Sequence, residues 1–114
     1  MKLVHFTPEE FKQGNKNVYN NMDKGFLVKL DNLRELCGMP LKINSSYRDK
    51  EYNKSVGGSE NSMHILGRAV DIACNNSVTR GIILKNALNL GLTCGVYKNW
   101  IHVDDRLTQL VYVV

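Results

Sequence analysis

The sequence predicts an α+β domain in which a small, mainly antiparallel sheet is flanked by helices. Segments with helical hydrophobic spacing and segments with strand alternation are mixed along the chain, and they do not alternate as regular βαβ units. The chain has 114 residues, of which 43% are hydrophobic, as expected for one soluble domain with its own core. Residues 1–114 are therefore expected to form a single domain.

The first third of the chain is expected to form two helices. Residues 7–10 (Thr-Pro-Glu-Glu) have the pattern of a helix start, with threonine as N-cap and proline at the first helical position. Gly14 and nearby asparagines keep that helix short. A longer helix is predicted over residues 21–37 and ends at Gly38. Its apolar stripe at helical spacing consists of Met22, Phe26, Leu30, Leu33 and Cys37.

The rest of the chain is expected to form short strands and a third helix. Residues 49–54 are predicted to make one helical turn, and residues 57–61 form a loop by composition. Ser77 is expected to cap a helix over residues 77–90, which Gly91 closes. Strands are expected at residues 41–45, 68–74, 93–97, 100–104 and 110–114.

Composition argues against several classes of function. The net charge of +4 is modest and the basic residues are scattered, so nucleic-acid binding is not expected. No segment resembles a membrane span, so membrane insertion is not expected. The first residues lack the apolar run of a signal peptide, which predicts a chain that is made in the cytoplasm and first resides there. Cys37, Cys74 and Cys94 have apolar neighbours, which favours reduced cysteines in the core.

Asp71 is the first residue that core packing alone does not explain. It lies in mid-strand between Val70 and Ile72, where burial of an unpartnered carboxylate is costly. Its neighbours on the same strand face, Ala69 and Ala73, are small and leave room beside it. A divalent cation is an effective partner for such a group.

Two histidines are candidates to share that cation. His102 alternates with Asp104 on one strand face, and His64 follows a Gly-Ser-Asn loop that would let it turn back toward Asp71. Two histidines and a carboxylate make the ligand set of an open, catalytic zinc site, whereas structural sites more often recruit cysteines. A lone histidine in an apolar strand is more often a structural side chain, so residue types and spacing alone leave both interpretations open. His5 keeps the structural interpretation.

A resemblance to a known family extends over nearly the whole chain. Ser62-x-His64, Gly67-x-Ala69-x-Asp71 and His102-x-Asp104 resemble the pattern of the zinc DD-peptidases, which are peptidoglycan carboxypeptidases and endopeptidases with the hedgehog/DD-peptidase fold. Residues 44–48 (Asn-Ser-Ser-Tyr-Arg) resemble that family's strand-to-loop segment. Asn53 with residues 56–58, and the opening segment 6–11, extend the likeness.

The resemblance implies that His64, Asp71 and His102 bind Zn²⁺ as the cofactor. In such a site the metal lowers the pKa of its water toward about 7 and polarises the scissile carbonyl. Arg48 matches the family's substrate-binding arginine, which is suited to hold a peptide carboxylate or to stabilise oxyanion charge. The alternative for Arg48 is a surface ion pair with a neighbouring acid.

The identity of a general base stays open. Many members of the broader group carry an acid three residues before the last histidine, but this chain has Asn99, which cannot accept a proton at neutral pH. Three explanations are open. Asp104 or Glu60 takes the role of the base, the zinc-bound hydroxide needs little help from a base, or the site binds zinc and hydrolyses little substrate. Asp104 is alternatively expected to orient a ligating histidine, and Ser62 to hydrogen-bond substrate or a ligand.

Three functional hypotheses remain, of which the first two come from different classes. The first is a zinc metallopeptidase that hydrolyses peptidoglycan stem or cross-bridge peptides next to a D-amino acid, as a D,D- or L,D-carboxypeptidase or endopeptidase. A chain without a leader fits a phage endolysin released at lysis, or part of a phage particle, that acts on the cell wall. The alternative is a zinc-stabilised, weakly active or inactive cell-wall-binding module, which Asn99 favours. A third is a non-peptidoglycan amidase. The expected binding partners are peptidoglycan peptides. The protein is expected to be a monomer.

Overall fold

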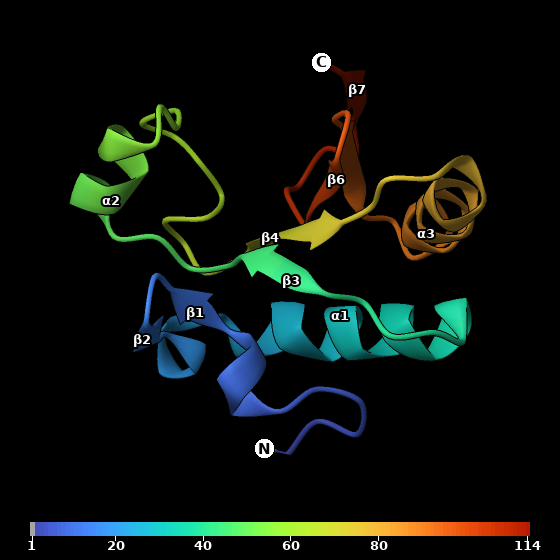
Figure 1. The fold of residues 1–114 in the computed structure, drawn as a ribbon, viewed down its shortest axis with the longest axis horizontal. Coiled ribbons are helices and arrows are strands. Elements are labelled where there is room, and N and C mark those ends of the chain that lie inside the picture. The colour runs from blue at the N-terminus through green and yellow to red at the C-terminus, as the bar shows by residue number, and fades with distance from the viewer. Residues whose placement is uncertain (1) are drawn as a thin grey trace.

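The computed structural model describes residues 2–114 and has an α+β architecture built around one five-stranded sheet (Figure 1). Neighbouring strands are antiparallel except for the last pair, β5 and β7, which is parallel. This arrangement confirms the predicted mainly antiparallel sheet. In spatial order the strands are β3 (Ile43–Ser45), β4 (Ala69–Ala73), β6 (Trp100–Asp104), β5 (Thr93–Val96) and β7 (Val111–Val113).

Two helices pack against the apolar face of this sheet. They are α1 (Lys24–Cys37) and α3 (Ser77–Asn89), which contact each other, and α3 also contacts β5. A short helix, α2 (Lys50–Ser55), follows β3 and lies away from the other two (Figure 1). The shared core contains Phe26, Leu30 and Leu33 of α1, Ile83 and Ala87 of α3, and Val70, Ile72, Ile101 and Val103 of the central strands.

The two faces of the sheet differ because strand side chains alternate. Val70 and Ile72 of β4 are fully buried in the core, whereas Asp71 between them points to the opposite face. The predicted faces of this strand are thus confirmed. With both helices covering the apolar face, the opposite face of the central strands is available for a pocket.

The N-terminal segment differs from the prediction. The first helix is a single 3₁₀ turn, η1 (Pro8–Glu10), at whose start the backbone amide of Thr7 donates to the carboxylate of Glu10 at 2.8 Å. Gly14 lies at the turn of a small hairpin, β1 (Lys12–Gln13) and β2 (Lys16–Asn17), which the sequence did not indicate. Strands of two residues are too short to show alternation, which is why this hairpin escaped prediction.

The start of α1 and the N-cap of α3 differ from the prediction. A 3₁₀ turn, η2 (Tyr19–Asn21), precedes α1, and α1 itself begins after Asp23, whose side chain accepts a hydrogen bond from the amide of Phe26. The N-cap of α3 is Asn76 rather than Ser77, because the Asn76 side chain accepts from the amide of Thr79. Asparagine and aspartate compete well with serine for this role.

Cys74 and Cys94 are buried in the core and Cys37 is half-buried against it, as predicted for small apolar side chains. Burial, together with the nearby Asp104 carboxylate, raises the pKa of the Cys94 thiol to about 12. Among residues 2–114, no helix has the length and apolar character needed to cross a bilayer.

Candidate functional site

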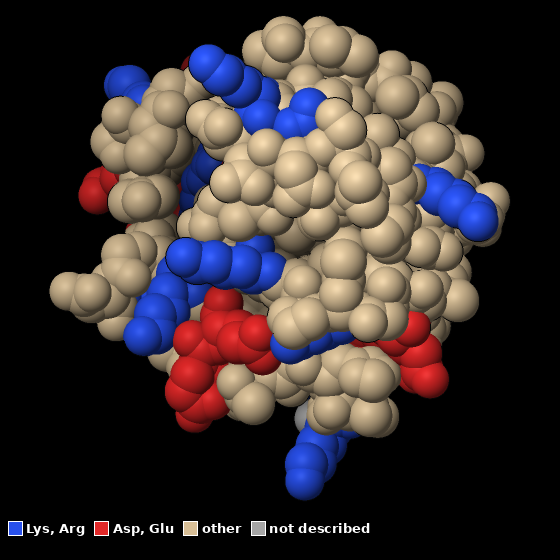
Figure 2. Space-filling view, turned by 45° about the vertical axis from the view of Figure 1, so that its right-hand side comes forward, with Lys and Arg blue, Asp and Glu red and all other residues tan. Residues whose placement is uncertain are grey.

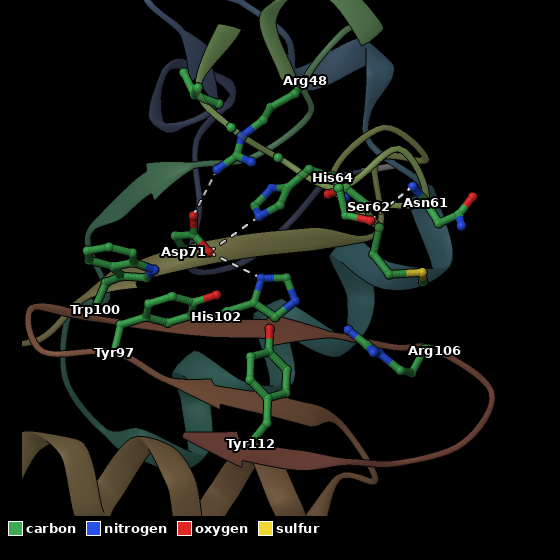
Figure 3. A pocket seen from close by; sticks show the side chains of 15 residues that line it. Arg48, Asn61, Ser62, His64, Asp71, Tyr97, Trp100, His102, Arg106 and Tyr112 are labelled. Atoms are coloured by element: carbon green, nitrogen blue, oxygen red, sulfur yellow. Dashed lines mark hydrogen bonds and ion pairs between the residues drawn. The ribbon is translucent and has the colours of Figure 1, made fainter. Parts of the chain in front are cut away.

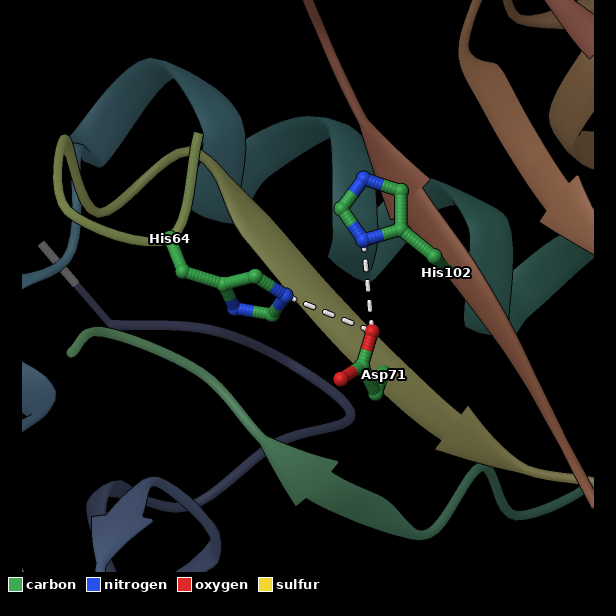
Figure 4. A group of neighbouring side chains, drawn as sticks. All are labelled: His64, Asp71 and His102. Atoms are coloured by element: carbon green, nitrogen blue, oxygen red, sulfur yellow. Dashed lines mark hydrogen bonds and ion pairs between the residues drawn. The ribbon is translucent and has the colours of Figure 1, made fainter. Parts of the chain in front are cut away.

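Three segments bring together the residues predicted to bind a metal. His64 comes from the turn before β4, Asp71 from the middle of β4, and His102 from the middle of β6 (Figure 4). Asp71 and His102 lie directly opposite each other in the antiparallel register. One ligand atom of each residue lies within 4.8 Å of the others, and all three side chains are buried.

The turn that carries His64 is held against the start of α1. Gly67 has φ +69°, and a Cβ there would collide with the backbone oxygen of Asn21. This close approach allows the amide of Asp23 to donate a hydrogen bond of 2.9 Å to the Gly67 carbonyl. On the other side of the turn, the amide of Arg48 donates to the carbonyl of His64 at 3.1 Å. Glycine at position 67 is therefore required by packing.

Each histidine is oriented by the ring nitrogen that does not face Asp71. Nδ1 of His64 lies 2.8 Å from the carbonyl oxygen of Ser46, and Nε2 of His102 lies 2.7 Å from Oδ2 of Asp104. Both partners are acceptors, so these nitrogens carry the protons. The lone pairs left over, on Nε2 of His64 and Nδ1 of His102, lie 3.3 Å and 3.2 Å from the same oxygen of Asp71.

Three hydrogen-bond acceptors therefore face one another: Nε2 of His64, Nδ1 of His102 and Oδ1 of Asp71. None of these three atoms carries a proton that it could donate to the others. Such an arrangement is repulsive unless a proton or a metal cation lies among the acceptors. Neutral imidazoles whose outer N–H groups are held by a carbonyl and a carboxylate are the usual surroundings of metal-ligating histidines. The donor set and its hydrogen bonds thus fit a divalent metal ion held by His64, Asp71 and His102.

The charges in this cluster stabilise one another. Burial opposes ionisation of Asp71, but hydrogen bonds with His102 and His64 outweigh it and hold the pKa of the carboxyl well below its usual range. Burial similarly opposes protonation of His102, yet Asp104 and Asp71 raise the pKa of that imidazole above its ordinary value. The cluster thus favours an ionised carboxylate beside a positive charge.

Asp104 lies behind His102 and does not line the pocket. Its carboxylate is fully buried and accepts hydrogen bonds from the backbone N–H and side chain of Arg106. Hydrogen bonds with His102 and Arg106 outweigh the cost of burial and keep the pKa of Asp104 well below its usual value. Of the two roles considered for Asp104, this geometry favours the orienting one. The sequence did not single out Arg106, although its spacing of two residues from Asp104 is a usable signal.

Arg48 points into the site. Its Nη2 lies 3.2 Å from Oδ2 of Asp71, while its Nε and Nη1 donate to Ser45 and Asn53 at 3.0 and 3.3 Å (Figure 3). The alternative of a surface ion pair is not what the structure shows, because the adjacent Asp49 instead caps α2. Asn53 is itself buried and donates to the Ser59 carbonyl, so it links Arg48 to the pocket loop.

The candidate metal site opens into a pocket of about 600 Å³. Ser62 lies at its edge and accepts a hydrogen bond from the backbone amide of His64. Glu60 and Asn99 are exposed and are not among the lining residues, so neither position supplies a carboxylate or amide to the pocket wall. An aromatic side of the pocket was not predicted; it consists of Tyr97, Trp100 and Tyr112 (Figure 3).

The aromatic side is built by the turn that follows β5, which carries Tyr97, and by strands β6 and β7, which carry Trp100 and Tyr112. The rings of Tyr97 and Trp100 stack with centroids 4.5 Å apart, and Tyr112 meets Tyr97 edge-on at 6.3 Å. Burial raises the pKa of Tyr112, and the neighbouring Tyr97 adds to that effect. These three residues are separated by up to 15 positions in the sequence, so no local pattern joins them.

Fold and site together define a class of protein: an α+β domain with a candidate metal centre in which three protein ligands leave a coordination position for water or substrate. A sequence model of the peptidase M15 family matches residues 4–104. The chain therefore belongs to the peptidase M15 family, the zinc D-Ala-D-Ala carboxypeptidase family of metal-dependent peptidases, as its motifs predicted. No match was found among curated proteins.

Proposed function

We propose that this protein is a zinc peptidase that hydrolyses stem or cross-bridge peptides of peptidoglycan at a bond next to a D-amino acid. The observation that carries the proposal is the convergence of Nε2 of His64, Nδ1 of His102 and a carboxylate oxygen of Asp71 beside an open pocket. Membership in the peptidase M15 family supports the peptide substrate.

The nitrogen and oxygen ligand atoms of this site favour zinc over magnesium and calcium. Two imidazole nitrogens and one carboxylate suit this borderline ion, whereas magnesium and calcium prefer oxygen ligands throughout. The chemistry that bound zinc supplies here is Lewis acidity, which polarises a carbonyl and lowers the pKa of water toward about 7.

The charged groups of the pocket support an anionic peptide as substrate. Among the described residues that line it, Asp71 is the only carboxylate, whereas Arg48 and Arg106 contribute two guanidinium groups, of which that of Arg106 is paired with the buried Asp104 outside the pocket. Arg48 is anchored by Ser45 and Asn53, so its guanidinium is held in place before substrate binds. A guanidinium in this position is suited to a peptide carboxylate, which it binds with paired hydrogen bonds.

We further propose that the protein acts on the cell wall after release from the cell, as a phage endolysin does, or as part of a phage particle. The net charge of +4 favours approach to an anionic wall polymer, with an attraction that salt weakens.

One observation favours a second candidate, a zinc-stabilised wall-binding module with little or no turnover. Among the described lining residues no carboxylate is free to act as a base, because Asp71 faces the histidines and Asp104 is buried behind His102. The position where an acid is common carries the exposed Asn99. Both candidates use the same metal site, so hydrolysis separates them.

Incubation of the zinc-loaded protein with purified peptidoglycan tests the proposal directly. We expect new amino groups to appear, and mass analysis of the released muropeptides identifies the bond that is cleaved. A chelator, or alanine at His64, Asp71 or His102, should abolish both zinc binding and release. His5→Ala is the matched control, since His5 instead contacts Glu35. Tight zinc binding without any release would favour the binding module, and release by the metal-free protein would exclude the metal mechanism.

Arg48→Ala should separate substrate binding from metal binding. Arg48 contacts Oδ2 of Asp71, whereas the two histidines face Oδ1 of that carboxylate. We therefore expect the zinc content of the variant to stay stoichiometric. Loss of a charge-assisted contact to a substrate carboxylate is worth about 1.5–3 kcal/mol, so kcat/KM should fall roughly 10- to 100-fold. Steady-state kinetics and metal analysis on the same sample check both parts, and an unchanged kcat/KM would remove Arg48 from the substrate site.

A further inference from the structure

The C-terminal strand, β7, places the phenol of Tyr112 beside the candidate metal site. In the sheet register, Asp71 of β4 lies opposite His102 of β6, His102 lies opposite Gly95 of β5, and Gly95 is paired with Tyr112 of β7. These four residues form one row across the sheet. Tyr112 lies beyond residues 4–104, the segment that the family model matches.

Gly95 makes room for the tip of the Tyr112 ring. A Cβ at position 95 would collide with Cζ and the hydroxyl of Tyr112. The end of the phenol therefore occupies the space that a side chain on β5 would fill, one strand away from His102. In Figure 3 the hydroxyl points from β7 toward the ring of His102.

Neighbouring side chains fix the ring in this position. Its centroid lies 6.1 Å from that of His102 and 6.3 Å from that of Tyr97, and the guanidinium carbon of Arg106 lies 5.9 Å from it. A ring packed between such neighbours needs little reorganisation when substrate binds, which is what a hydrogen-bond donor in a reactive site requires.

The two guanidinium groups of the pocket are each paired with a carboxylate. Arg48 lies on the opposite side of the cluster against Asp71, and Arg106 is paired with the buried Asp104. A phenol keeps its proton at neutral pH, so it donates rather than accepts a proton.

We propose that the hydroxyl of Tyr112 donates a hydrogen bond to the carbonyl oxygen of the scissile peptide bond. When the oxygen of water adds to the carbonyl carbon, the π electron pair of the C=O bond moves to the carbonyl oxygen and the water loses one proton to solvent. The phenol stabilises the negative charge on that oxygen and keeps its own proton. When the C=O bond re-forms, the C–N bond breaks and the amine leaves with a proton from solvent. The inference rests on the proposed peptidase function and assigns one donor to that reaction.

Tyr112→Phe tests the inference because it removes the hydroxyl and keeps the ring over Gly95. Loss of one such donor is expected to lower kcat roughly 100-fold with little change in KM. Zinc content should remain stoichiometric, because Tyr112 is not a ligand. Tyr19→Phe, in which a phenol outside the pocket is removed, should keep wild-type kinetics.

A binding measurement supplies a readout that does not depend on turnover. A phosphinate peptide imitates the tetrahedral species, so its affinity should drop at least 10-fold in the Tyr112→Phe protein while the affinity for the product peptide stays the same. Equal kinetics and equal phosphinate affinity in wild type and variant would overturn the role of Tyr112 alone. A wild-type protein that neither cleaves peptidoglycan nor binds the phosphinate would overturn the proposed function and this inference with it.

Discussion

The carboxylate of Asp104 shows how one buried residue controls the candidate metal centre. It is fully buried, yet its oxygens are satisfied by the imidazole of His102 and by the backbone and side chain of Arg106. A buried charge is tolerated when it is paired and hydrogen-bonded in this way. Asp104 accepts a hydrogen bond from the protonated Nε2 of His102. The unprotonated Nδ1 of the same ring therefore directs its lone pair toward Asp71.

Asp104→Asn should weaken metal binding through His102. The variant keeps the shape but loses the negative charge that holds the imidazole N–H, and loss of such an outer hydrogen-bond partner costs about 10–100-fold in metal affinity. Competition with a chromophoric chelator measures this affinity.

Asp105→Asn is a suitable control, since Asp105 instead pairs with Arg68 and Lys29. If Asp104→Asn kept its full zinc affinity and lost only hydrolysis, Asp104 would act on the reaction rather than through His102.

Among the structural elements, the turn that carries His64 depends on close backbone contacts with its neighbours. It has no regular secondary structure and depends on its contacts with the start of α1 and with Ser46 and Arg48. Gly67 lies against the residues that precede α1. The turn requires its positive φ, and the close backbone contact with Asn21 requires that it have no side chain. The turn, and with it His64, is thus held by backbone contacts on both of its sides.

Gly67→Ala should destabilise the fold and the metal site together. The new methyl group would collide with the backbone of Asn21, and the residue would be forced to keep φ near +69°. Strain of this kind costs about 1–3 kcal/mol, which chemical denaturation measures.

Gly14→Ala separates the two contributions, because Gly14 has φ +61° but nothing within 4 Å of the added Cβ. We expect Gly67→Ala to lose more stability than Gly14→Ala and also to bind zinc less tightly. Equal losses in the two variants would mean that the contact with α1 is unimportant.

At the scale of the whole molecule, the position of the pocket follows from the way the sheet is covered. The core helices α1 and α3 bury one face of the sheet, while the ligands and the aromatic side chains gather on the other. The proposed ligands join β4, β6 and the turn before β4, so a bound metal would cross-link segments that are 31 residues apart between Asp71 and His102.

Zinc should therefore stabilise the folded protein. A ligand that binds only the native state adds about 2.7 kcal/mol when its free concentration is 100 times Kd, which corresponds to a rise in Tm of roughly 10 °C for a chain of this length. Thermal unfolding with zinc and with a chelator measures the difference. The His64→Ala protein should show no such shift, and a shift of the same size in that variant would place the metal elsewhere.

Much of the fold was predictable because its longer elements have clear periodicity. The strand at residues 100–104 was predicted with the observed bounds, and the stripe of α1 lies in the core apart from the half-buried Cys37. The features that were not predicted are of two kinds. The hairpin around Gly14 and the 3₁₀ turns are short, and the choice of Asn76 as the cap of α3 depends on competition between neighbouring residues. Local propensity does not decide such cases, since a few tenths of a kcal/mol separate the alternatives.

The sequence by itself determined the fold class, the family and the residues proposed as metal ligands, because periodicity, glycine positions and motif spacing are local properties of the chain. Only the tertiary structure decided which nitrogen of each histidine faces Asp71, that Asp104 lies behind His102, and that Arg48 turns inward. It alone placed Tyr112 beside the pocket, through the parallel pairing of β7 with β5 and the space left by Gly95. Hydrogen-bond direction and strand register depend on contacts between distant segments, so they exist only once the chain has folded.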